Sequence, residues 1–402
     1  METPGYDINE DFLAFVAEHS DDDIRKLWLQ HWDRNRRPEL TQIEAVQKAR
    51  NKIPTFARKS HFLFPNVVVA EQCTNEWVAQ FHASLFDGAR RVLDLTAGLA
   101  IDSYYIGRKA DEVVALEIDE TTALVDAINM TTLGADNVRV YRAEAIEWLT
   151  RHNDERFDAV YADPARRGDA CRRVYALDEC SPALSKVLPL LRGRAQYIIV
   201  KASPMLDVAY VVNNIENVSH IWAVSFRGEC KEILFRIELT DTPIDDVVIS
   251  AVGIGTEGVE WSIDYKWSER AAHNDCGNVA EGDLLYVPDA AIVKAGAGAA
   301  LLHRYPALRQ LHPATLLFSL KPEAERPVEG RLFTIDMVFT VKEAERWGRT
   351  RKQANVAVRN FPLTAAQLRA KLKVTDGGDT YAVGCRVADG SLRVIIGHKP
   401  AM

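Results

Sequence analysis

The chain has 402 residues, of which 47% are hydrophobic and 26% are charged, and its formal net charge is −8. This length accommodates two to four domains, and the composition is ordinary for soluble globular proteins. No apolar run approaches the roughly 20 residues of a membrane span, and the acidic, polar start does not resemble a secretory signal. The six cysteines are scattered without paired spacing, which predicts neither a metal site nor a disulfide framework and suggests a reducing cytoplasm.

Residues 1–88 predict a mainly helical region. Apolar residues recur at helical intervals in 11–16 and 23–29, and Pro54 and Pro65 interrupt the segment. A further helix is expected from Gln72 to Ala79, leading toward the first strand of the core. The pattern is compatible with a packing role or with a contact to substrate.

Residues 92–102 predict a short buried strand, a glycine turn and the start of a helix. Asp94 ends the apolar run with a carboxylate that can meet a cationic ligand, and Gly98 lets the backbone approach a ligand closely. Thr96 replaces the first glycine of the dinucleotide fingerprint, so the loop is poorly suited to bind the phosphates of a dinucleotide. The pattern D-x-T-A-G-x-A suits a smaller nucleoside ligand, and we expect S-adenosylmethionine. A turn of this kind without a ligand is the alternative.

A second apolar strand ends at Glu117, which follows Asp94 by 23 residues. An acid about 20 residues past the glycine turn accepts hydrogen bonds from the ribose hydroxyls in this architecture. Asp119 is a second candidate for the same role. A helix is expected after it, from Glu120 to Leu133, with Gly134 as its stop.

A third strand, residues 137–141, is followed by Glu144 and Ala145. An acid at this place commonly meets the adenine amino group, which makes Glu144 a candidate ligand of the adenine. The same residue can instead be a solvated side chain in the first turn of a helix, where an acid complements the helix dipole.

A fourth strand, residues 157–162, runs into Asp163-Pro164. Proline disfavours the helical region for the preceding residue, so Asp163 is held at the sheet edge above the cofactor. Its carboxylate suits a hydrogen-bond acceptor for an N–H of the methyl acceptor; a turn without chemistry is the alternative. A fifth strand ends at Lys201, and a strand pair in 220–239 closes the sheet.

Several of these segments together resemble the class I S-adenosylmethionine-dependent methyltransferases that carry a THUMP-like C-terminal domain. The segments that carry the resemblance are 94–102, 163–167, 229–232, 71–76 and 355–362. It implies an α/β fold: a Rossmann-like class I methyltransferase sheet at 89–240 after the helical region, then a ferredoxin-like domain at 241–325 and a THUMP-like domain at 326–402. THUMP domains are associated with RNA modification, so the resemblance implies an RNA partner.

One departure from nucleic-acid amino-methyltransferases follows Asp163-Pro164, where Ala165 and Arg166 replace a proline and an aromatic residue. Arg166 can stack on a base through its guanidinium plane or bind phosphate. The 5-methyluridine enzymes also have an arginine here, but they need a cysteine near the fifth strand, where this chain has Lys201. Cys171 lies near Asp163 in sequence without an evident base.

The C-terminal residues differ in charge from the rest of the chain. From Arg331 to the end there are 13 Lys and Arg against 6 Asp and Glu, a net charge of +7, so the remainder carries −15. Trp347 lies among Arg346, Arg349 and Arg351. This asymmetry is typical of a phosphate-binding module, although a solvated helix face also explains such runs.

Together these features predict an S-adenosylmethionine-dependent methyltransferase that acts on RNA, on a tRNA or rRNA base, without a metal. The alternatives are a small-molecule or protein methyltransferase with a structural C-terminal domain, and a non-catalytic RNA-binding protein with a vestigial cofactor site. The residues expected to bind the cofactor are Asp94, Thr96, Ala97, Gly98, Asp102, Glu117, Glu144 and Ala145, and those expected to act at the acceptor are Asp163, Arg166 and Lys201.

Overall fold

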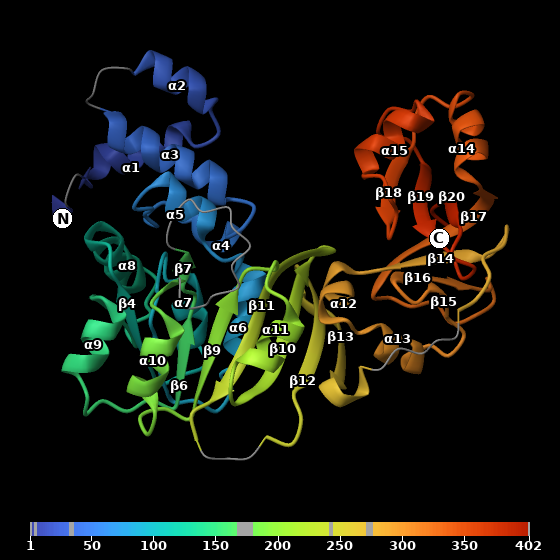
Figure 1. Cartoon of the computed structure of the whole chain (residues 1–402). Coiled ribbons are helices and arrows are strands. Elements are labelled where there is room, and N and C mark those ends of the chain that lie inside the picture. The colour runs from blue at the N-terminus through green and yellow to red at the C-terminus, as the bar shows by residue number, and fades with distance from the viewer. Residues whose placement is uncertain are drawn as a thin grey trace. The chain divides into compact units, whose positions relative to one another are not determined.

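The computed structural model describes residues 2–3, 6–31, 36–166, 180–240, 244–270 and 276–400, and it contains two large sheets with helices packed around them (Figure 1). The chain divides into two compact units. The first comprises residues 1–220, 233–245 and 254–259, and the second comprises residues 221–232, 246–253 and 260–402.

Apart from the short strands β1 and β2, the elements before residue 88 are helical, as the sequence predicts, and strands and helices alternate after them. The elements before residue 167 are β1 (Glu2–Thr3), β2 (Tyr6–Asp7), α1 (Glu10–His19), α2 (Ile24–Gln30), α3 (Arg37–Ala49), α4 (Pro54–Ala57), α5 (Val67–Gln72), α6 (Glu76–Ser84), β3 (Arg91–Asp94), α7 (Ile101–Gly107), β4 (Glu112–Glu117), α8 (Glu120–Thr132), β5 (Val138–Arg142), α9 (Ala145–Arg151), β6 (Ala159–Ala162) and β7 (Ala165–Arg166).

The elements after residue 179 complete the first sheet and build the second. They are β8 (Cys180–Ser181), α10 (Leu184–Leu191), β9 (Tyr197–Ala202), α11 (Val208–Asn214), β10 (Val218–Phe226), β11 (Glu229–Glu238), β12 (Val248–Gly255), β13 (Gly258–Lys266), a 3-10 helix (Trp267–Glu269), β14 (Leu284–Pro288), α12 (Ala290–Ala295), α13 (Gly298–Arg304), β15 (Arg309–His312), β16 (Thr315–Leu320), β17 (Gly330–Phe339), α14 (Val341–Gly348), β18 (Asn355–Arg359), α15 (Ala365–Leu372), β19 (Thr380–Arg386) and β20 (Leu392–His398).

The larger sheet has nine strands in the order β13-β12-β10-β11-β9-β6-β3-β4-β5. Strands β5, β4, β3, β6 and β9 are parallel, and β11 runs antiparallel to β9. Parallel strands buried on both faces need continuous apolar runs, and all four residues of β6 are buried. The strand order reverses between β3 and β6, which is where open α/β sheets bind ligands. The predicted Rossmann-like α/β sheet is therefore confirmed.

The helices at the start of the chain are fixed by local capping and by an apolar core. Asn66 caps α5 by accepting from the Val69 N–H at 2.9 Å, and Asn75 caps α6 by accepting from the Trp77 N–H at 3.1 Å. Below them a cluster of buried side chains, which includes Phe56 and Phe62, packs against residues of the β3–α7 region such as Leu99. This packing attaches the helical region to the strand that carries the glycine turn.

Residues 241–325 differ from the expected ferredoxin-like domain, because their described strands divide between the two sheets. Strands β12 and β13 extend the nine-stranded sheet, while β14, β15 and β16 belong to a seven-stranded sheet of order β15-β16-β14-β17-β20-β19-β18. Strand β14 pairs antiparallel with β17, Leu284 facing Thr334. Alternating apolar residues identify a strand, but they do not say which neighbour it joins.

The last seventy residues form the strand, helix, strand, helix, strand, strand succession that the sequence predicts. Strands β17, β20 and β19 pair antiparallel, and β18 lies parallel to β19 through the crossover helix α15. Thr340 and Thr364 begin α14 and α15 with capping boxes, each accepting from a backbone N–H three residues later. No helix in the described ranges is long and apolar enough to cross a membrane.

Candidate active site

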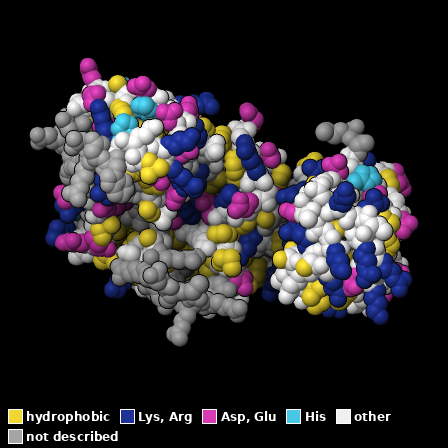
Figure 2. All heavy atoms as spheres, turned by 90° about the horizontal axis from the view of Figure 1, so that it is seen from above, with side chains coloured by type: hydrophobic (Ala, Val, Ile, Leu, Met, Phe, Trp, Pro, Cys, Tyr) yellow, Lys and Arg dark blue, Asp and Glu magenta, His cyan; other side chains and the backbone are white. Residues whose placement is uncertain are grey.

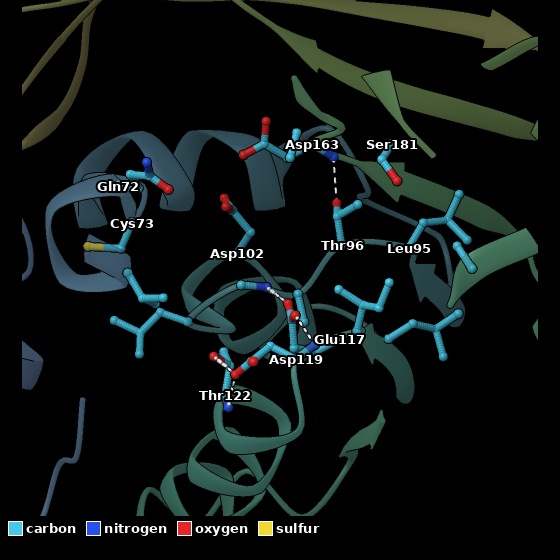
Figure 3. Close-up of a pocket in the computed structure, with 18 of the residues that line it drawn as sticks. Gln72, Cys73, Leu95, Thr96, Asp102, Glu117, Asp119, Thr122, Asp163 and Ser181 are labelled. Atoms are coloured by element: carbon cyan, nitrogen blue, oxygen red, sulfur yellow. Dashed lines mark hydrogen bonds between the residues drawn. The ribbon is translucent and has the colours of Figure 1, made fainter. Parts of the chain in front are cut away.

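A cavity of about 750 Å³ opens at the carboxyl ends of β3, β4 and β6 (Figure 3). Its volume lies in the range of small-molecule sites, and it occupies the switch point of the parallel sheet. The expected site residues that line it are Thr96, Ala97, Gly98, Asp102, Glu117, Glu144, Ala145 and Asp163. Asp94 and Lys201 contact lining residues from outside the cavity.

Asp94 shapes the glycine loop and does not face the cavity. Its Oδ1 accepts from the Thr96 N–H at 2.9 Å, its Oδ2 accepts from the Ser103 hydroxyl at 2.5 Å, and the side chain is fully buried. Burial raises the pKa of Asp94 to about 7, although both hydrogen bonds oppose the rise. The expectation that this carboxylate meets a cationic ligand directly therefore does not fit the geometry, because Asp94 is buried beneath the loop and is not among the residues that line the cavity.

The loop after Asp94 turns sharply through two residues of left-handed conformation. Gly98 has φ of +55° and Ala100 has φ of +53°. Only the first of these is a glycine, so Ala100 carries the strain that an L-residue meets in this region. The Gly98 N–H points to Glu117 at the end of the neighbouring strand, donating to its Oε2 at 2.9 Å (Figure 3).

Glu117 is better placed than Asp119 to bind a ligand in the cavity. The Glu117 carboxylate accepts from the Gly98 and Asp119 N–H groups at 2.9 and 2.8 Å, and burial raises its pKa. A carboxylate has about four acceptor positions, so two N–H bonds leave room for two hydroxyl donors. Asp119 instead caps α8, since it accepts from the N–H and the hydroxyl of Thr122 at 2.9 and 2.8 Å.

Glu144 is the N-cap of α9, accepting from the Glu147 N–H at 2.8 Å, and it also lines the cavity. Its helix-end role is thus confirmed, and a contact to adenine stays a prediction. Ala145 is the first residue of that helix and is buried. Its N–H belongs to the set that an α-helix leaves without an intrahelical acceptor.

Asp163 and Lys201 form an ion pair at the acceptor side of the cavity. Their Oδ2 and Nζ atoms are 2.6 Å apart, and the Asp163 N–H donates to the Thr96 hydroxyl at 2.6 Å. The Asp163 side chain is 40% exposed and that of Lys201 is 12% exposed. The Asp163 carboxylate, which lines the cavity, is thus paired with a nearly buried ammonium and keeps oxygen positions that can accept from a ligand.

Two expectations concern residues that are described in part or not at all. Ala165 and Arg166 form β7, which pairs with β8 through Ala165–Ser181 and Arg166–Cys180. The Arg166 side chain and Cys171 lie outside the described part of the structure. The backbone nevertheless places Ala165, Ser181 and Pro182 in the cavity wall.

Asp102 lines the cavity, but its oxygens bind two residues that sequence reasoning missed. Oδ1 lies 2.7 Å from His82 Nδ1, and Oδ2 accepts from the Thr74 hydroxyl at 2.6 Å. Burial alone would raise the pKa of Asp102, but the charge and hydrogen bond of His82, with help from Lys201 and Thr74, lower it to about 2. His82 lies on the buried stripe of α6 with Val78 and Ala79, where the sequence offers no signal that distinguishes it from a packing residue.

Within the described residues no group of three or more His, Cys, Asp or Glu side chains could hold a metal ion. The carboxylates in and beside the cavity bind protein groups instead: Asp94 bonds to Thr96 and Ser103, Glu117 to two backbone N–H groups, and Asp102 to Thr74. The cavity thus offers carboxylate and backbone groups suited to a nucleoside with hydroxyl and amino donors.

Comparison with known proteins found similarities to the C-terminal residues and to most of the chain. Residues 330–399 match the family described as THUMP domain-like. An uncharacterized S-adenosylmethionine-dependent methyltransferase of Mycobacterium tuberculosis is 27% identical over 346 residues, 83% of this chain and 87% of that protein. A solved structure of an inferred methyltransferase from Porphyromonas gingivalis is 27% identical, covers 98% of this chain and 100% of its own, and superposes with a TM-score of 0.82.

A shorter match concerns an enzyme with a named substrate. The 23S rRNA uracil C5-methyltransferase of Photobacterium angustum is 41% identical over 83 residues, which is 20% of this chain and 37% of that enzyme. The likeness therefore extends over one segment and not over either whole protein.

Proposed function

The chain is a class I S-adenosylmethionine-dependent methyltransferase with a C-terminal THUMP-like domain, and we propose that it methylates a base of ribosomal or transfer RNA. The observation that carries the proposal is a cluster of exposed cations on the THUMP-like residues, on a chain whose cavity suits a nucleoside cofactor. The segment shared with a 23S rRNA methyltransferase supports the same acceptor class. Such an acceptor also implies a cytoplasmic location.

In this proposal the cofactor is held by groups at three strand ends. Glu117 accepts from the ribose hydroxyls, and the backbone of Ala97 and Gly98 approaches the methionine end. Glu144 and the Ala145 N–H face the adenine. Ile118 is 65% exposed although it is apolar, and it lines the cavity beside Glu117, so we assign it to the flat face of the adenine ring.

When bound, S-adenosylmethionine supplies an electrophilic methyl group on a cationic sulfur. The part of this chain is to place the acceptor in line with that group and to receive the acceptor's proton. Asp163 is the carboxylate that accepts from the N–H of the base and takes its proton, and the ion pair with Lys201 holds that carboxylate in place. We assign Arg166 to the substrate, as a stacking or phosphate-binding group.

An exocyclic or ring nitrogen is a better acceptor here than the C5 carbon of uracil. The C5 reaction needs a thiolate nucleophile, and among the described cysteines Cys73 lines the cavity. Burial raises the pKa of the Cys73 thiol to about 11, so this thiol is protonated at neutral pH and reacts poorly. Asp163 suits transfer to nitrogen, which has a proton to give up.

The proposed RNA-binding surface lies at the C-terminal ends of α14 and α15. The five exposed cations there, Arg346, Arg349, Arg351, Lys352 and Lys373, form no ion pair within the described part of the chain, whereas Arg369 pairs with Asp376 and Lys371 with Glu345. The ends of the two helices are close, because a Cβ at Gly348 would lie 2.1 Å from the Leu372 carbonyl oxygen. Figure 2 shows Lys and Arg side chains gathered on the C-terminal unit. Exposed cations gathered in this way suit contacts with the phosphates of a nucleic acid.

The test is mass spectrometry of nucleosides from total RNA of cells with and without the gene, followed by methylation of the deficient RNA with purified protein. We expect one methylated nucleoside to disappear with the gene and to return in vitro. The double charge reversal Arg349→Glu with Arg351→Glu should weaken RNA binding and its salt dependence. A matched reversal in the same unit, Arg326→Glu with Lys399→Glu, should leave the RNA affinity and its salt dependence within about twofold of the wild type. An unchanged nucleoside profile with intact S-adenosylmethionine binding would instead favour a protein or small-molecule acceptor.

A further inference from the structure

A chain of polar contacts runs from the acceptor side of the cavity into the helical region. Lys201 Nζ lies 2.6 Å from Asp163 Oδ2 and donates to the Thr74 hydroxyl at 3.1 Å. Thr74 donates in turn to Asp102 at 2.6 Å, and Asp102 binds His82 at 2.7 Å. Figure 3 shows Asp163 and Asp102 directed toward the same part of the cavity, with Cys73, the neighbour of Thr74, on its wall.

The direction of the two bonds at Thr74 is fixed by its partners. The pKa of Asp102 is lowered to about 2 by its cationic partners against the effect of burial, so its ionised carboxylate can only accept. An ammonium can only donate. The single Thr74 proton must therefore go to Asp102, and the oxygen of the same hydroxyl must accept from Lys201. The Thr74 hydroxyl thus bridges the ammonium of Lys201 and the carboxylate of Asp102, and a side chain without a hydroxyl cannot make both bonds.

The position of Thr74 is itself held by the helices that precede it. The Lys52 ammonium donates to the carbonyl of Glu71, at the end of α5, and to that of Cys73, on the segment between α5 and α6. Glu76, at the start of α6, accepts from the N–H and the hydroxyl of Thr55 at 3.0 and 3.1 Å. Thr74 is only 9% exposed. The helical region therefore presents this hydroxyl rigidly to Lys201.

We propose that Thr74 is a positioning residue for methyl transfer, which fixes the Lys201 ammonium against Asp163 and so orients the carboxylate that meets the acceptor. The inference rests on the proposed role of Asp163 at the acceptor. It assigns a function to the helical region, because the hydroxyl that completes the acceptor side comes from residues before the Rossmann-like sheet. Thr74 also lines the cavity, but in this role it acts through Lys201 and not on the acceptor itself.

The experiment compares Thr74→Val with Thr74→Ser and with Thr55→Val. Two properties are measured on the full chain: methyl transfer from S-adenosylmethionine to RNA of the gene-deleted strain, and labelling of the Lys201 amine by acetic anhydride, quantified by mass spectrometry. The control Thr55→Val removes a hydroxyl–carboxylate bond from the same region without touching Lys201. Binding of S-adenosylmethionine and the melting temperature report on folding.

We expect Thr74→Val to lower kcat about tenfold and to raise Lys201 labelling about tenfold, the effect of losing one hydrogen bond to a charged group. The KM for S-adenosylmethionine should stay within twofold, Thr74→Ser should restore both properties, and Thr55→Val should change neither. Unchanged labelling and unchanged kcat in Thr74→Val would overturn the inference. If Thr74→Val does not fold, Thr74→Ala is measured in the same way. Because labelling needs no RNA, it decides the role of Thr74 even if the wild-type chain methylates no RNA.

Discussion

Glu117→Gln tests the cofactor site directly, because its effect can be worked out from the hydrogen bonds. The carboxylate accepts from the Gly98 N–H at 2.9 Å and from the Asp119 N–H at 2.8 Å. A glutamine has one oxygen and one NH2 group, so one of these two N–H groups must face a donor, and one charged acceptor for the ribose is lost. Hydrogen bonds to charged groups contribute about 1.5–3 kcal/mol. We therefore expect S-adenosylmethionine to bind about 10- to 150-fold more weakly.

The assay is titration calorimetry with S-adenosylmethionine, S-adenosylhomocysteine and the 2′-deoxy analogue of the latter. If Glu117 binds the ribose, the wild-type chain should prefer the hydroxylated ligand and the variant should discriminate poorly between the two. Asp119→Asn is the matched control, since asparagine also caps a helix well, and its affinity should stay within about twofold. The assignment would be refuted if Glu117→Gln bound S-adenosylmethionine as tightly as the wild type does. It would also be refuted if the variant still bound the 2′-deoxy ligand more weakly than the hydroxylated ligand, by the same factor as the wild type.

Three further predictions concern stability and catalysis. Asp94 has a raised pKa of about 7, so the folded chain keeps that proton to higher pH than the unfolded chain, and stability should fall as pH rises from about 4 to 7. Asp94→Asn should remove this fall, so that the free energy of unfolding of the variant exceeds that of the wild type increasingly from pH 5 to 8, by at most about 4 kcal/mol. Denaturant unfolding at each pH measures this difference, and a difference that does not change with pH would contradict the assignment. Asp163→Asn should lower kcat about 100-fold with S-adenosylmethionine affinity unchanged in calorimetry, and a variant with wild-type turnover would exclude Asp163 from proton removal. Gly348→Ala places a methyl group 2.1 Å from the Leu372 carbonyl oxygen and should destabilise the C-terminal unit by about 1–3 kcal/mol. Thermal unfolding of that unit, monitored by its susceptibility to proteolysis, measures the change, and an unchanged unfolding temperature would contradict the prediction.

The local pattern of residues was sufficient to predict the elements that surround the cavity. Strand β4 is a run of apolar residues that ends in Glu117, and β6 is another that ends before Asp163-Pro164. Such runs identify buried parallel strands because both of their faces are covered, and parallel strands bring their carboxyl ends to one edge. The grouping of Thr96, Glu117, Glu144 and Asp163 around one cavity follows from that rule.

Tertiary structure alone decided what each carboxylate does. Asp94 and Glu117 both end a strand, yet the first is closed off by Thr96 and Ser103 while the second faces the cavity. The sequence also did not show which strands β12 and β14 pair with, because strand pairing depends on contacts distant in sequence. His82 shows the same limit: in sequence it is one member of an apolar helix stripe, and its pairing with Asp102 exists only because α6 packs against α7, which brings residues twenty positions apart within hydrogen-bond distance.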